Sequence, residues 1–93
     1  MKRPRTFRAC GGRRGRIVWG MPHPRERAWA LCWPDHHTIQ LPIAVDDETL
    51  CKCVCEELIH DHAPILSEEC VGAMSDAISD LLARLGYDRD GDE

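Results

Sequence analysis

The sequence has no long apolar run and few aromatic residues. No stretch approaches the roughly 20 apolar residues that a membrane-spanning helix needs, and residues 1–5 lead into no apolar signal segment. We therefore expect a cytoplasmic protein with no membrane partner. A single Phe and a single Tyr accompany three Trp. Because the indoles are the main large side chains, we expect Trp19, Trp29 and Trp33 to form the core.

Acidic residues are almost missing from the first 27 positions. This segment holds nine Lys or Arg and one acid, Glu26, whereas the remainder holds three basic and fifteen acidic residues. A basic arm from Lys2 to Arg16 could contact the phosphates of nucleic acid, which gives affinity without sequence choice. Phe7 is the only aromatic residue among these cations, however, and stacking on bases needs aromatic rings. A solvated arm is the simpler interpretation, and nucleic acid is the alternative partner.

No secretion signal accompanies the six cysteines. Disulfide frameworks are typical of secreted chains of this size, so we expect free thiols here. Cys51, Cys53 and Cys55, followed by His60-Asp61-His62, could also form a thiolate and imidazole metal cluster. In a helix, Cys51 and Cys55 share one side and Cys53 points away, so a cysteine-based metal-binding protein is only the third interpretation.

With 93 residues, of which 43% are hydrophobic and 30% charged, the chain suits one small globular domain. We divide it into a basic arm at residues 1–5, a single domain at 6–87 and an acidic tail at 88–93. No repeat interrupts this organisation.

Two hairpins are expected in the first half of the domain. The first spans residues 6–20, with Gly11-Gly12 as its turn. The second joins residues 28–32 to Thr38–Leu41 through the turn Pro34-Asp35-His36. Pro42 ends the last strand.

Two helices are expected in the second half. Asp46 or Asp47 can cap the first helix, which runs to about His62, and Pro64 stops it. Ser67 caps the second helix, whose apolar residues recur at helical spacing. They are Val71, Met74, Ile78, Leu81, Leu82 and Leu85, and Gly86 follows as the C-terminal cap. Strands followed by helices predict an α+β domain, with a small, mostly antiparallel sheet packed against both helices.

The first of these helices carries a polar side. Glu56 and His60 are four residues apart, so they lie one turn from each other, with Glu57 at the margin of this side. We expect the opposite side to face the core through Leu50, Cys51, Val54, Cys55 and Leu58. Two ligands one turn apart can hold one metal ion, and a carboxylate directly after the first ligand can act as general base.

Four segments in this order carry a family resemblance: Thr38–Leu41, Asp47–Leu50, Glu57–His60 and Leu66–Val71. They resemble small phage and bacterial zincin-like metallopeptidases, related in plan to SprT-like and ImmA/IrrE-like peptidases. Those proteins run from a strand to a helix with His-Glu-Leu-Leu-His, then a short loop and a Ser-Glu-Glu helix. The resemblance covers roughly residues 6–87.

The resemblance implies a minimal zincin-like fold and hydrolysis of a peptide or protein substrate through a metal-activated water. Carried over by position, His60 is a metal ligand, Glu57 is the catalytic base and Glu69 is the third ligand, with Glu68 as the alternative. Glu56 stands where the family has its first histidine. Because a glutamate can ligate zinc through oxygen, Glu56 completes a feasible set. Two carboxylates would lower the preference for Zn²⁺ relative to harder ions such as Mn²⁺.

The replaced histidine leaves a second function open. In this alternative, the chain is a degenerate relative that holds no metal and cleaves no peptide. The zincin-like fold then serves as a binding module, and the basic arm contacts nucleic acid or an acidic protein.

Overall fold

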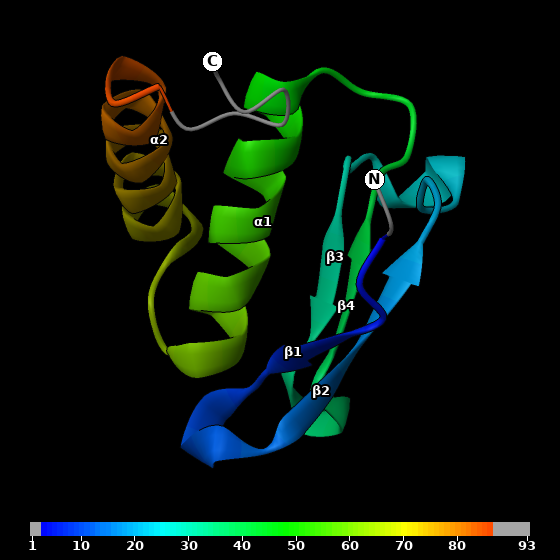
Figure 1. The fold of residues 1–93 in the computed structure, drawn as a ribbon. Helices are drawn as coiled ribbons and strands as arrows, with labels where there is room; N and C mark the ends of the chain where they lie inside the picture. The colour runs from blue at the N-terminus through cyan, green and yellow to red at the C-terminus, as the bar shows by residue number, and fades with distance from the viewer. Residues whose placement is uncertain (1–2, 87–93) are drawn as a thin grey trace.

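The computed structural model describes residues 3–86 as a small α+β domain (Figure 1). The first two residues of the expected basic arm and the expected acidic tail at 88–93 lie outside the described residues. The elements are β1 (Thr6–Arg8), β2 (Arg14–Trp19), β3 (Leu31–Trp33), β4 (Thr38–Leu41), α1 (Asp47–His62) and α2 (Glu68–Arg84). Neither of the two helices in this part of the chain has the length and apolar character needed to cross a membrane.

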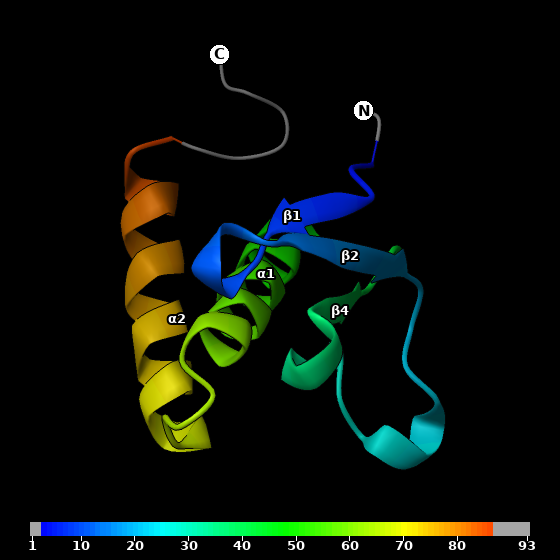
Figure 2. The ribbon, with the colours of Figure 1, turned by 90° about the horizontal axis from the view of Figure 1, so that it is seen from below.

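Both expected hairpins are present. β1 pairs antiparallel with β2, and the turn between them places Gly11 and Gly12 at φ of 77° and 78°, a conformation that favours glycine. β3 begins at Leu31 and not at residue 28 as expected, and it pairs antiparallel with β4 across a 3-10 turn at Pro34–His36. The turn between β1 and β2 lies next to the C-terminal end of α1 (Figure 2). There Cys10 donates its backbone N–H to Asp61 Oδ2 at 3.0 Å.

The two hairpins join through a parallel pair of strands. The strand order is β1-β2-β4-β3, and β2 runs parallel to β4 with Arg16 opposite Thr38 and Trp19 opposite Leu41. The sheet is therefore mostly antiparallel, as expected, with one parallel pairing at its centre. This order leaves β3 at one edge of the sheet.

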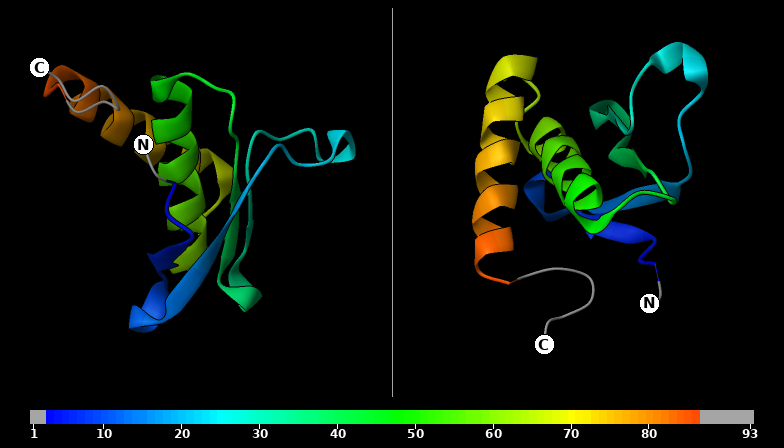
Figure 3. Two further views of the ribbon diagram at one scale, coloured as in Figure 1. Left: turned by 45° about the vertical axis from the view of Figure 1, so that its right-hand side comes forward. Right: turned by 90° about the horizontal axis from the view of Figure 1, so that it is seen from above.

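The molecule has three layers: the sheet, then α1, then α2 (Figures 1 and 3). The core lies between the sheet and α1, where Ile39 and Leu41 of β4 meet Cys53 of α1. Within residues 3–86, no helix covers the other face of the sheet. A Cβ at Gly15 of β2 would meet the ring of Phe7, so any other residue there would force that ring to move.

Two expectations about the core are only partly right. Trp29 is 57% exposed and Trp33 is 39% exposed, so only Trp19 packs against the core. On α1, Cys53 is buried against the sheet, whereas Cys51 and Cys55 are only half-buried and do not join the core. The other three expected residues pack against the core: Leu50, Val54 and Leu58. The reason is that α1 is a middle layer: it has one side toward the sheet and another toward α2, so a single core-facing side does not describe it.

Candidate functional site

A cavity of about 870 Å³ lies beside α1, between the edge strand β3 and the start of α2. We call it the acidic cavity. Its walls include the carboxylates of Glu48, Glu56, Glu57 and Glu68 and the imidazole of His60. Lys52 also lines it, but its Nζ lies 2.7 Å from Asp76 Oδ1 of α2. The cavity therefore gathers negative charge with little local neutralisation.

Local sequence signals place these side chains on the cavity wall. Asp46 Oδ1 accepts the Thr49 N–H at 2.7 Å and begins α1, and Ser67 Oγ accepts the Cys70 N–H at 3.1 Å and begins α2. The short connection at residues 63–67 reverses the chain between the helices. As a result Glu68, the first residue of α2, lies against His60 near the end of α1, with Oε1 3.3 Å from Nε2.

Glu57 is the buried carboxylate of this site, with 7% of its surface exposed. Three causes together raise the pKa of Glu57 from 4.5 to about 7. Burial is the largest, and the negative charges of Glu56 and then Glu68 add to it. A carboxyl group with this pKa exchanges its proton near neutral pH, which is the property of a general acid or base. The expected role of Glu57 as catalytic base stays a prediction.

The imidazole nitrogen and the carboxylate oxygens of the cavity are atom types that bind divalent cations such as Zn²⁺. Two donors bound to one ion at about 2.0–2.1 Å with tetrahedral geometry lie about 3.3 Å apart. His60 Nε2 and Glu68 Oε1 lie 3.3 Å apart, a distance that equally describes a direct contact between the imidazole and the carboxylate. Throughout residues 3–86, no group of three His, Cys, Asp or Glu side chains is arranged so that it could hold a metal ion. The structure thus brings two donors together, and Glu56 and Glu57 share the cavity wall with them.

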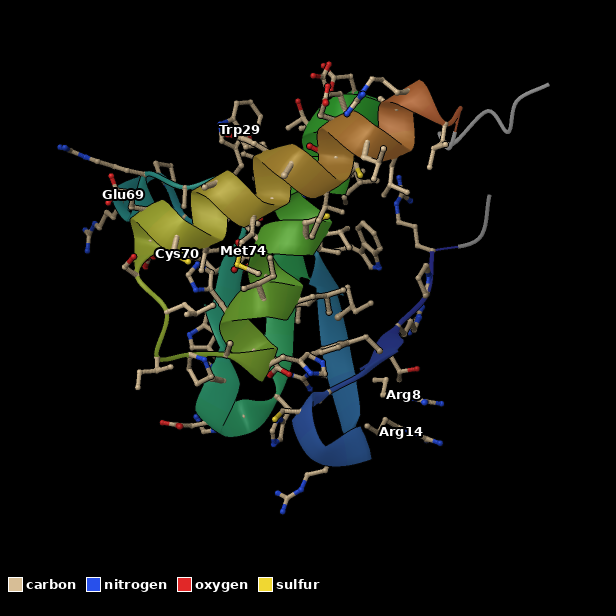
Figure 4. All side chains as sticks on the ribbon, turned by 90° about the vertical axis from the view of Figure 1, so that its left-hand side faces the viewer. Arg8, Arg14, Trp29, Glu69, Cys70 and Met74 are labelled. Atoms are coloured by element: carbon tan, nitrogen blue, oxygen red, sulfur yellow. The ribbon has the colours of Figure 1, made fainter. Side chains whose placement is uncertain are left out.

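Glu69, the expected third ligand, lies elsewhere. It is exposed at the start of α2 (Figure 4) and is not part of the cavity wall. Consecutive residues of a helix point about 100° apart, so only one of the two acids can face His60. Glu68, the alternative at this position, is the acid that does so.

A second polar cluster, which the sequence analysis missed, holds Asp61 at the end of α1. Asp61 is 3% exposed, accepts the backbone N–H of Cys10, and lies with Oδ1 3.4 Å from His37 Nδ1. His62 Nε2 lies 3.0 Å from the Arg8 carbonyl oxygen, so this imidazole faces the first hairpin and not the cavity. Asp61 follows Glu57 by four residues, so both side chains lie on the same side of α1, and this spacing could have indicated that Asp61 is buried like Glu57. These contacts connect α1 to both hairpins.

The thiols do not favour a cysteine metal cluster. All six cysteines are free. Burial raises the pKa of Cys53 to about 11 and of Cys55 to about 11, and raises that of Cys32, beside Glu57, to about 12. Cys53 is buried against the sheet, whereas Cys51 and Cys55 lie next to each other on another side of α1, so the three thiols do not meet at one ion.

An exposed indole also borders the acidic cavity. Trp29 lies in the loop before β3 (Figure 4) and lines the cavity together with Ala30 and Leu31. Because Trp29 was expected in the core, its place in the cavity wall was not predicted. An exposed aromatic side chain next to an edge strand gives the cavity an apolar wall opposite its acidic one.

No family model, no curated protein and no solved structure matches this chain. The class that the geometry defines is a small α+β domain with an acidic cavity between a sheet edge and two helices. Its zincin-like character stays a prediction from the sequence.

Proposed function

We propose that the chain is a minimal zincin-like peptidase that hydrolyses peptide bonds in the acidic cavity with the help of a divalent cation. The main support is the buried Glu57, whose pKa is about 7, next to the imidazole and carboxylate pair of His60 and Glu68. Burying carboxylates without neutralising partners is unfavourable for folding, and such groups gather at sites that use them.

The roles follow from where each side chain lies. His60 and Glu68 would hold the cation, with Glu68 in the place first expected for Glu69. Glu56, in the position of the family's first histidine, would be the third donor. When bound, Zn²⁺ or Mn²⁺ supplies charge that polarises the substrate carbonyl and acidifies water. The carboxylate of Glu57 takes the proton of the attacking water and passes it to the leaving amine. Its pKa near neutrality suits both transfers.

The substrate is an extended stretch of peptide or protein. β3 is an edge strand beside the cavity, so its main chain can pair with a peptide that lies along it. Trp29 and Leu31 then provide apolar contacts for the peptide side chains. Six free thiols suit the reducing cytoplasm, where we expect the protein to act.

The proposal is tested by cleavage of a fluorescently labelled unfolded protein with added Zn²⁺ or Mn²⁺. Glu57→Gln keeps the shape of the side chain and removes the base, so the rate should fall by at least about 100-fold. Glu69→Gln is the matched control, since that residue lies outside the cavity, and it should keep the wild-type rate. Equal cleavage by the wild type and Glu57→Gln would contradict the proposal and favour the non-catalytic binding module.

A metal titration separates binding from catalysis. Calorimetry with Zn²⁺ should show binding to the wild type and to Glu57→Gln, because the base is distinct from the ligands. His60→Ala should lose that binding. If His60→Ala binds the cation as tightly as the wild type, the assignment of His60 is wrong.

A further inference from the structure

The face of the sheet opposite α1 is open and basic. Side chains alternate along a strand, and Phe7, Ile17, Cys32 and Ile39 point toward the core. Gly15 lies opposite Phe7 and shares its side of the sheet. Their neighbours along the strands therefore point away from α1, and these neighbours include Arg8, Arg14, Arg16, Thr38 and Trp33. We call this surface the open face. Within residues 3–86, no helix packs on it.

The strand register brings a tryptophan into line with an arginine. Thr38 of β4 lies opposite Arg16 of β2 on one side and opposite Trp33 of β3 on the other. Adjacent strands are about 4.8 Å apart, so Arg16 and Trp33 are roughly 10 Å from each other on one row. A shallow hollow of about 370 Å³ lies there, lined by Arg16, Trp33 and Thr38 together with Val18 and His36.

The arginines of the open face have no acidic partners. Arg8 and Arg14 lie directly opposite each other on β1 and β2, and Figure 4 shows both side chains extending from this hairpin. Like charges in this position destabilise a sheet. None of the ion pairs within residues 3–86 includes Arg8, Arg14 or Arg16. The chain has a net charge of -4, so acids are plentiful elsewhere, and the unpaired cations point to an anionic partner.

We propose that the open face binds single-stranded nucleic acid. The guanidinium groups of Arg8, Arg14 and Arg16 contact phosphates, which match their planar fork of donors. A base stacks on Trp33, whose indole is 39% exposed at the end of the row. A duplex hides the faces of its bases, so a hollow beside an exposed indole favours a single strand. This surface is separate from the acidic cavity, and the inference is independent of peptidase activity.

The test measures binding of a fluorescently labelled oligothymidine by anisotropy at several salt concentrations. Trp33→Ala should weaken binding at least about fivefold. Arg14→Ala should also weaken binding and should reduce the slope of log affinity against log salt by about 0.7, the value for one lost phosphate contact on a single strand. Both side chains are exposed, so circular dichroism should show an unchanged fold.

Two matched controls belong to this experiment. Trp29→Ala removes a more exposed indole, which borders the acidic cavity, and Arg84→Ala removes an exposed arginine of α2. Both variants should bind as the wild type does. An effect of Trp29→Ala equal to that of Trp33→Ala would overturn the placement of the base on the open face.

Three further results would overturn the proposal. The first is no binding of oligothymidine at about 50 mM salt, where phosphate contacts are strong. The second is a duplex that binds as tightly as the single strand. The third is a polyglutamate peptide that binds equally well and is unaffected by Trp33→Ala, which would identify an acidic protein as the partner.

Discussion

Replacing Glu57 with glutamine should change how the stability of the protein depends on pH. Burial and two neighbouring carboxylates raise the pKa of Glu57 from 4.5 to about 7 in the folded protein. The folded protein therefore binds this proton more tightly than the unfolded chain. Below about pH 4.5 both states hold the proton, and this carboxyl causes no loss of stability. As the pH rises through about 7, the folded state must carry a buried charge and stability falls.

The size of the effect follows from the same values. A pKa that moves from 4.5 to about 7 corresponds to about 3.4 kcal/mol, at 1.36 kcal/mol for each pH unit. The cavity is open to water, which screens the charge, so about 2 kcal/mol is a better expectation. Glu57→Gln carries no such charge. Relative to its value at pH 4, the stability of the variant should exceed that of the wild type by about 2 kcal/mol at pH 8.

The measurement is urea unfolding followed by circular dichroism between pH 4 and pH 8, with a chelator present so that no cation neutralises the cavity. Comparing the two proteins at each pH isolates the contribution of residue 57 from the other titrating groups. Glu69→Gln is the control for the loss of one acidic side chain, because Glu69 is exposed and lies outside the cavity. A difference between Glu57→Gln and the wild type that does not grow with pH would refute the buried, ionisable Glu57 on which the proposed mechanism depends.

Three further predictions concern the two helices. Excess Zn²⁺ or Mn²⁺ should raise the unfolding temperature of the wild type in a calorimetric scan, whereas His60→Ala and Glu68→Gln should lose this rise and Glu69→Gln should keep it. Ser75 is fully buried in α2 and its hydroxyl has no hydrogen-bond partner within residues 3–86, so Ser75→Ala should stabilise the protein by about 1 kcal/mol in urea unfolding; a loss of stability would reveal a partner. Asp61→Ala should destabilise the protein by about 1–3 kcal/mol in the same assay, because the Cys10 N–H loses its acceptor; an unchanged midpoint would contradict the role given to Asp61.

The secondary structure could be predicted from the sequence because local signals mark most of its boundaries. Asp46 and Ser67 cap the helices where expected, and Gly11 and Gly12 adopt the conformation that the first turn needs. The parallel pairing of β2 with β4 could not be predicted. This pairing depends on the path of residues 20–30, which connect β2 to β3. The segment contains two prolines and has no periodic hydrophobic pattern from which its path could be predicted.

The candidate site was only partly predictable, for a similar reason. Spacing along one helix places Glu57 and His60 near each other, since that geometry is local. Whether Glu68 or Glu69 meets His60 depends on how α2 rotates against α1, which one sequence does not determine. The same holds for the open face, because Trp33 comes into line with Arg16 only through the register of three strands.

The separation of His60 and Glu68 onto different helices has a mechanical consequence. α2 packs mainly on α1, so it is the outermost layer and is held to the domain chiefly through that helix. If the first turn of α2 moved away from α1, Glu68 would separate from His60 and would no longer line the cavity. A cation held by both groups would clamp the two helices together. Amide hydrogen exchange should then slow in α2 on addition of the ion, while the strands at the centre of the sheet exchange as before.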